Sequence, residues 1–98
     1  MNIQHHTEGQ TLTIALEGRL DTTTAPALDA DLQASLDGVK ELVLDLSALD
    51  YLSSAGLRVL LSAQKRMNRQ GRMVVRNVCE TVMEVFNMTG FSDILTIE

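Results

Sequence analysis

The side chains best suited to chemistry lie in a short polar segment between two apolar segments. The centre of interest is a turn formed by Ser53, Ser54, Ala55, Gly56 and Leu57. A hydroxyl in the first turn of a helix faces N–H groups that have no partner within the helix, and it faces the positive end of the helix dipole. Such a serine can cap the helix, which is a structural role. It can also accept a phosphate, which adds about 1.5–2 negative charges and need not unfold the domain.

The remaining nucleophilic, basic and metal-ligating side chains do not form a second site. The only histidines, His5 and His6, are neighbours in a predicted strand, so they point to opposite faces. No Cys/His spacing resembles a zinc site, and no glycine-rich phosphate loop is present. Cys79 is expected to be a buried structural cysteine. We therefore expect a protein that is not an enzyme and has no cofactor and no metal.

The charge is unevenly distributed along the chain. Residues 1–50 contain nine acids and only Arg19 and Lys40 as bases, whereas residues 51–98 contain four acids and six bases. The net charge of −5 argues against direct nucleic-acid binding, for which a strongly basic domain is expected. The basic residues of the second half form either a solvated helix surface or a docking face.

The length of 98 residues predicts a single domain, residues 1–98. No stretch approaches the roughly 18 apolar residues of a membrane span, so we expect no membrane insertion. The N-terminus lacks the basic flank and apolar run of a secretory signal. The single cysteine, Cys79, cannot form an internal disulfide and fits a reducing compartment. These features predict a cytoplasmic protein.

Hydrophobic periodicity predicts the elements that must position the 53–57 turn. We predict strands at residues 3–7, 11–17, 41–46, 72–76 and 94–97. We predict a helix that a threonine of the triplet Thr22–Thr24 caps and Gly38 ends, and a second helix over residues 54–70. We predict a third helix with Asn77 as its N-cap, Glu80 as the reciprocal partner and Gly90 as its end. The order β-β-α-β-α-β-α-β begins with a hairpin and continues through helical crossovers, which join parallel strands. The fold class is therefore α/β, with a mixed sheet of four to five strands and helices mainly on one side.

Three motifs, in this order, resemble the STAS domains, which are bacterial anti-sigma-factor antagonists and related domains of sulphate transporters. The motifs are residues 17–21 (EGRLD), 42–47 (LVLDLS) and 51–61 (YLSSAGLRVLL), and the third is the most specific. The resemblance covers essentially the whole chain and implies the STAS (SpoIIAA-like) fold.

The resemblance also implies a mechanism and a set of partners. In this family the unphosphorylated antagonist binds an anti-sigma factor, usually a serine kinase, and so frees a sigma factor and regulates transcription indirectly. Phosphorylation of the hydroxyl residue just before the turn's glycine abolishes binding, and a serine phosphatase resets the switch. Such a domain is expected to be a monomer or a weak dimer.

Asp21 corresponds to the aspartate of a family motif. The partner-binding residues that the resemblance implies are Asp21, Ser53, Ser54, Ala55, Gly56, Leu57 and Arg58.

One position departs from the family pattern, because Ala55 precedes Gly56 and has no hydroxyl. Phosphorylation then shifts to Ser54, which we favour, or to Ser53. Alternatively, the protein docks constitutively, like the small STAS subunits of ABC-type lipid transport systems. A nucleotide-binding role is a third reading, since some relatives are reported to bind nucleotides, but no catalytic set accompanies it.

Overall fold

The computed structural model describes residues 1–98 and contains one mixed sheet of four strands in the order β1-β2-β3-β4. The strands are β1 (Asn2–Glu8), β2 (Thr11–Leu20), β3 (Glu41–Leu52) and β4 (Arg72–Arg76). The helices are α1 (Ala25–Ser35), α2 (Ser54–Gln70), α3 (Glu80–Thr89) and the 3₁₀ turn η1 (Phe91–Asp93). The hairpin β1-β2 is antiparallel, whereas β2, β3 and β4 are parallel neighbours joined through α1 and α2. The predicted fold class is confirmed.

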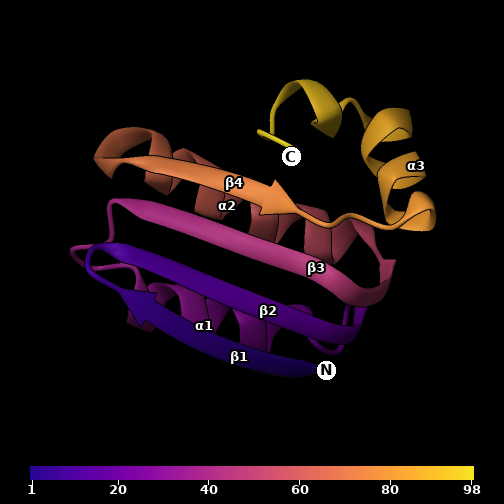
Figure 1. The fold of residues 1–98 in the computed structure, drawn as a ribbon. Helices are drawn as coiled ribbons and strands as arrows, with labels where there is room; N and C mark the ends of the chain where they lie inside the picture. The colour runs from indigo at the N-terminus through magenta and orange to yellow at the C-terminus, as the bar shows by residue number, and fades with distance from the viewer.

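The helices α1 and α2 cover one face of the sheet, and α3 lies beyond the end of β4 (Figure 1). The helix-facing side chains of β3, Leu42, Leu44 and Leu46, are fully buried in the main hydrophobic core. They alternate with Val43, which is also buried but points to the opposite face beside Val74 of β4. Burial on both faces explains why β3 is nearly continuously apolar in its first half.

The predicted last strand at residues 94–97 is not formed. In its place, η1 is followed by a single parallel bridge between Val75 and Ile97, and of the four predicted strand residues only Leu95 is buried. The Val75 amide donates to the carbonyl of Thr96, and the Glu98 amide donates to the carbonyl of Val75, both at 2.8 Å. The segment therefore reaches the edge of β4 at one point, and the sheet keeps four strands.

The predicted capping of the third helix is also wrong in detail. Its N-cap is Cys79, and Asn77 lies two residues earlier with a positive φ of 60°. Asn77 donates its side-chain amide to Asp45 at 3.2 Å, so it joins the end of β4 to β3. The predicted end of the helix is confirmed, because Gly90 has the left-handed φ of 80° that favours glycine after a helix.

Candidate functional site

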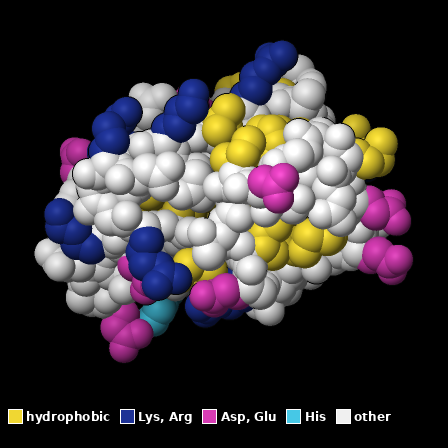
Figure 2. Space-filling view, turned by 90° about the horizontal axis from the view of Figure 1, so that it is seen from above, with side chains coloured by type: hydrophobic (Ala, Val, Ile, Leu, Met, Phe, Trp, Pro, Cys, Tyr) yellow, Lys and Arg dark blue, Asp and Glu magenta, His cyan; other side chains and the backbone are white.

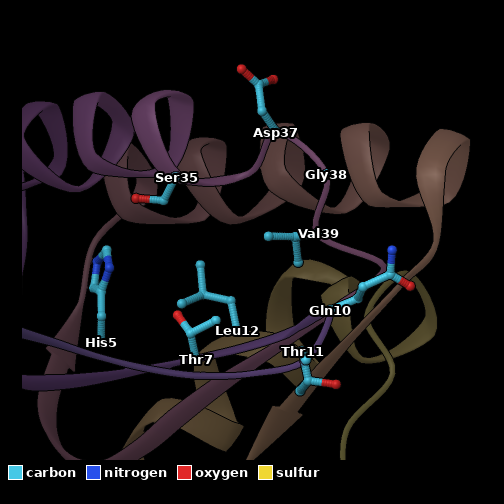
Figure 3. Close-up of a pocket in the computed structure, with 10 residues that line it drawn as sticks. His5, Thr7, Gln10, Thr11, Leu12, Ser35, Asp37, Gly38 and Val39 are labelled. Carbon is cyan, nitrogen blue, oxygen red and sulfur yellow. The ribbon is translucent and has the colours of Figure 1, made fainter.

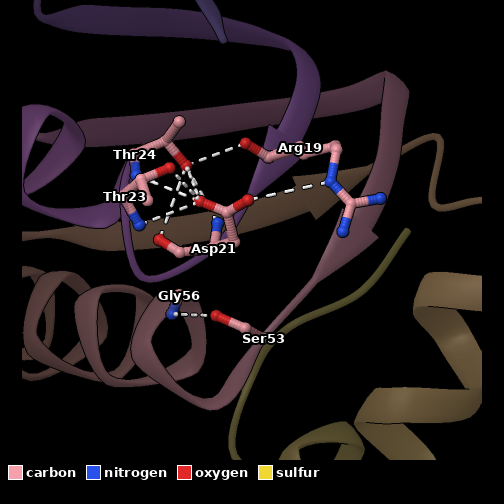
Figure 4. Close-up of polar contacts among 6 residues, drawn as sticks. All are labelled: Arg19, Asp21, Thr23, Thr24, Ser53 and Gly56. Atoms are coloured by element: carbon pink, nitrogen blue, oxygen red, sulfur yellow. Dashed lines mark hydrogen bonds and ion pairs between the residues drawn. The ribbon is translucent and has the colours of Figure 1, made fainter.

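The 53–57 turn connects the end of β3 to the start of α2, and its backbone is attached to β2. The Ser53 amide donates to the carbonyl of Leu20 at 2.9 Å. Ser53 has extended backbone angles and is the N-cap of α2, where its Oγ accepts a hydrogen bond from the Gly56 amide at 3.4 Å (Figure 4). The turn is therefore held by the first hydrogen bonds of α2 and by the end of the neighbouring strand.

Close packing fixes the position of the first turn of α2. Gly56 is buried, and a Cβ at this position would lie 2.7 Å from Leu20 Cγ and 2.7 Å from Leu52 Cδ1. Leu57, the next residue, is also buried in the core. Two of the predicted partner-binding residues, Gly56 and Leu57, therefore lie inside the protein and can affect a partner only by supporting the turn.

Ser54, Ala55 and Arg58 form the accessible part of the predicted site. Ser54 is the first residue of α2 and is exposed, as is Arg58 one turn later. Ala55 is half-buried and lines an open groove of about 380 Å³ between the first turns of α1 and α2. The other residues that line this groove are Thr22, Ala25, Pro26, Asp29, Arg58 and Val59. The sequence predicted the turn, whereas the groove depends on the packing of α1 against α2.

Asp21 organises the other side of the site, at the end of β2. Its Oδ1 accepts hydrogen bonds from the Thr23 hydroxyl at 2.7 Å, the Thr23 amide at 3.0 Å and the Thr24 amide at 3.2 Å (Figure 4). The hydrogen bond from the Thr23 hydroxyl is the main cause that lowers the pKa of Asp21 below its usual value. Partial desolvation raises the pKa, and the hydrogen bonds from the Thr23 and Thr24 amides lower it further. Asp21 is therefore an ionised carboxylate that fixes the turn leading into α1. We expected a threonine to cap α1, but Thr24 makes no side-chain capping bond.

Sequence reasoning missed a contact that ties the two strand ends together. The Arg19 guanidinium lies 4.1 Å from the centroid of the Tyr51 ring, and Arg19 Nε lies 3.7 Å from Asp21 Oδ2. Arg19 and Tyr51 are cross-strand partners only because the β2-β3 register shifts twice on the way to them. A sequence pattern does not reveal such shifts, so this contact had no sequence signal.

The histidines and the cysteine lie away from the turn. His5 Nε2 lies 2.6 Å from Asp31 Oδ2 on α1, and His6, on the other face of β1, is exposed. His5 and Ser35 border a polar cavity of about 360 Å³ at the opposite end of the sheet, and Asp37 points away from it (Figure 3). Cys79 is half-buried, and its Sγ lies 3.4 Å from the carbonyl oxygen of Leu49.

No group of three or more His, Cys, Asp or Glu side chains is arranged to hold a metal ion. None of the helices combines the length and the apolar character that crossing a bilayer requires.

Comparison with known proteins gives consistent matches over nearly the whole chain. The family model described as STAS domain matches residues 2–98. BtrV of Bordetella bronchiseptica, named as an anti-sigma factor antagonist, is 41% identical over 88 residues, which are 88% of this chain and 76% of that protein. The structure of an anti-sigma factor antagonist from Mycobacterium paratuberculosis has a TM-score of 0.89 at 24% identity, covering 98% of this chain and 83% of that one.

SpoIIAA from Bacillus has been solved in an unphosphorylated and a phosphorylated form. Each form has a TM-score of 0.77 and 20% identity to this chain and covers 99% of it, together with 87% and 91% of the respective SpoIIAA chains. At this identity the likeness concerns the fold alone. The same architecture therefore exists in both states of that protein.

Proposed function

Since the chain belongs to the STAS domain family, we propose that it is an anti-sigma-factor antagonist that binds its partner through the 53–58 surface and is released by phosphorylation of Ser54. The names of the relatives support the general role. The partner is an anti-sigma factor that is itself a serine kinase, and a serine phosphatase reverses the modification. The protein is a binding module and not an enzyme.

The different environments of the two serines carry the choice of Ser54. Ser53 is half-buried and its hydroxyl is engaged as the N-cap of α2, whereas Ser54 is exposed at the first helical residue. A kinase needs an accessible hydroxyl, and a phosphate at a helix N-terminus is electrostatically favourable. Ala55 cannot accept a phosphate, so Ser54 is the accessible hydroxyl nearest to Gly56.

Capture from the native cell, followed by phosphosite mapping, tests this function. We expect wild-type protein to retain an anti-sigma factor with a kinase domain, and ATP to place one phosphate on Ser54. Ser54→Ala should retain the partner and resist phosphorylation, whereas Ser54→Asp should lose the partner. Phosphate on neither serine, together with unchanged binding by Ser54→Asp, would exclude the switch.

Ala55 favours a second candidate function, the constitutive STAS subunit of an ABC-type lipid transport system. Without a hydroxyl before Gly56, the surface need not be switched at all. In that case the capture would recover a transport ATPase subunit in place of a kinase, and Ser54→Asp would bind it as well as wild type does. A variant that restores the family hydroxyl, Ala55→Ser, separates the two functions further, because only a partner kinase would phosphorylate it.

A further inference from the structure

Three positively charged side chains on α2 have no acidic partner. The salt bridges of the molecule use the other arginines, Arg19, Arg66, Arg72 and Arg76. The cations that remain outside any salt bridge are Arg58, Lys65, Arg69 and Lys40, and the first three belong to α2. Arg66, which also lies on α2, differs from them because it pairs with Asp37 at 2.6 Å.

The three unpaired cations lie on one side of the helix. Arg58, Lys65 and Arg69 are separated by seven and four residues, which correspond to about two turns and one turn. All three are exposed, and the span from residue 58 to residue 69 is about 16 Å at 1.5 Å per residue. We call these three residues the α2 stripe. Ser54 lies four residues before Arg58, so the proposed phosphorylation site continues the same side of the helix.

The charge of the molecule makes the stripe unusual. The chain has a net charge of −5, so unpaired cations gathered on one helix do not follow from a generally basic surface. Figure 2 shows Lys and Arg side chains spaced along one edge of the molecule, with hydrophobic side chains gathered toward the α3 end. Two large apolar side chains of the C-terminal part of the chain are exposed, Met88 of α3 by 87% and Ile94 after η1 by 47%. Charges at the margin of an apolar area are the arrangement found in protein interfaces.

We infer that the α2 stripe is a docking surface for an acidic surface of the partner protein, an inference that rests on the proposed function. A phosphate on Ser54 acts on this surface in two ways. It places about 1.5–2 negative charges where the acidic partner must approach. It also lies four residues from Arg58, the spacing at which opposite charges pair along a helix. The phosphate would therefore form an ion pair with Arg58 and remove the first cation of the stripe from contact with the partner.

Charge reversal with the captured anti-sigma factor tests the stripe. Lys65→Glu and Arg69→Glu should each weaken binding about tenfold, mainly by slowing association, and the loss should shrink as salt is raised. Lys40→Glu is the matched control, because Lys40 is also an exposed, unpaired cation and undergoes the same change of charge. We expect it to bind as wild type does. Equal affinities for wild type, Lys65→Glu and Arg69→Glu would overturn the inference.

This design separates the two levels of the proposal. If wild-type protein binds no anti-sigma factor, the proposed function fails. If wild type binds one and the charge-reversal variants bind it equally well, only the docking stripe fails.

A second experiment needs no natural partner. Amide chemical shifts of the protein are followed while a 20-residue oligoglutamate peptide, a DNA duplex, or vesicles containing phosphatidylserine are added at the same ionic strength. We expect shifts over residues 54–69 with the acidic peptide, and their loss in Lys65→Glu but not in Lys40→Glu. Absence of these shifts, or stronger binding to DNA or to vesicles than to the peptide, would overturn the assignment to a protein surface.

Discussion

Ser53 and Ser54 are neighbours in the sequence but have different environments in the fold. The Ser53 hydroxyl accepts the Gly56 amide at the start of α2, while Ser54 is exposed. Removal of the hydroxyl should therefore have a different effect at each of the two residues. Stability should depend on Ser53, and modification should depend on Ser54.

Alanine substitution at each serine tests this separation. Ser53→Ala should lower the free energy of unfolding by about 0.5–2 kcal/mol, because α2 loses its N-cap. Ser54→Ala should stay within about 0.5 kcal/mol of wild type, as exposed substitutions usually do. Urea denaturation measures both values, and each variant serves as the control for the other. A larger loss for Ser54→Ala than for Ser53→Ala would contradict the assignment of the cap.

The hydrogen bonds of Asp21 predict a dependence of stability on pH. Its pKa is lowered below the ordinary 3.8, chiefly by the Thr23 hydroxyl, so the folded state binds the proton more weakly than the unfolded state does. The stabilisation is then present above the unfolded pKa and is lost as pH falls through the folded pKa. Asp21→Asn keeps an acceptor oxygen but removes the charge, which weakens these hydrogen bonds.

Thermal unfolding of wild type and Asp21→Asn between pH 2 and pH 8 measures this effect. Wild type should have the higher Tm above about pH 5, and the difference should begin to shrink below about pH 4 and be lost as pH falls through the folded pKa. Asp50→Asn, a change at an exposed acid that precedes the turn, controls for net charge. A difference between wild type and Asp21→Asn that stays constant down to pH 2 would show that the charge of Asp21 is not involved.

At the scale of elements, the first turn of α2 can lie against β2 and β3 only because residue 56 is glycine. Gly56→Ala would place a Cβ 2.7 Å from atoms of Leu20 and Leu52, which are both buried. Overpacking of this kind costs about 1–3 kcal/mol and exceeds the gain in helix propensity, which is at most about 1 kcal/mol. We expect a net loss of about 1–2 kcal/mol in urea denaturation, with Ser62→Ala on the exposed side of α2 as control. A Gly56→Ala variant more stable than wild type would show that the contact relaxes freely.

The elements that the sequence predicts well are those with extensive burial. The helix at 54–70 is predictable because its buried side chains repeat at helical spacing, and the strand beginning at Glu41 is predictable because a short continuous apolar run is typical of a strand buried on both faces. The strand predicted at residues 94–97 is not formed, although three of its four residues are apolar. Its backbone pairs with β4 only at Ile97. The sequence of four residues does not show how far that segment lies from a partner strand.

In the candidate site, too, the local features were predictable from the sequence and the long-range contacts were not. The turn at 53–57 was predictable, because hydroxyls, glycine and the start of an apolar helix are adjacent in sequence. The pairing of Arg66 with Asp37, which leaves Arg58, Lys65 and Arg69 as the unpaired cations of α2, joins residues 29 positions apart. Such a contact depends on how α2 lies beside the loop that follows α1, so the sequence could not separate Arg66 from the docking stripe.

At the scale of the whole molecule, the topology gathers the site at one end of the sheet. Parallel β2 and β3 end on the same side, where the turns into α1 and α2 follow them directly (Figure 1). Asp21 and Ser53 therefore lie close together although they are far apart in sequence. Asp21 pairs with Arg19 of β2, and the Ser53 amide donates to the carbonyl of Leu20. A ligand or partner that meets this end contacts residues whose positions are set by the central strands and not by a long loop.

This placement predicts that phosphorylation changes the surface and preserves the fold. Ser54 is exposed, and a phosphate at the first residue of α2 interacts favourably with the helix dipole, by about 0.3–1 kcal/mol at an exposed site. The Tm of Ser54-phosphorylated protein should therefore equal or slightly exceed that of the unmodified protein.

Amide chemical shifts of the phosphorylated protein provide the structural measurement. Changes should be confined to the amides around Asp21 and in the first two turns of α2, which include Arg58. In Arg58→Gln the phosphate should titrate at a higher pH than in the Arg58 protein, because a nearby cation stabilises its dianion. Lys40→Gln should leave that titration unchanged. Shift changes spread across β1 and β4, or a fall in Tm, would mean that phosphorylation acts by disturbing the fold, and the surface mechanism would then be wrong.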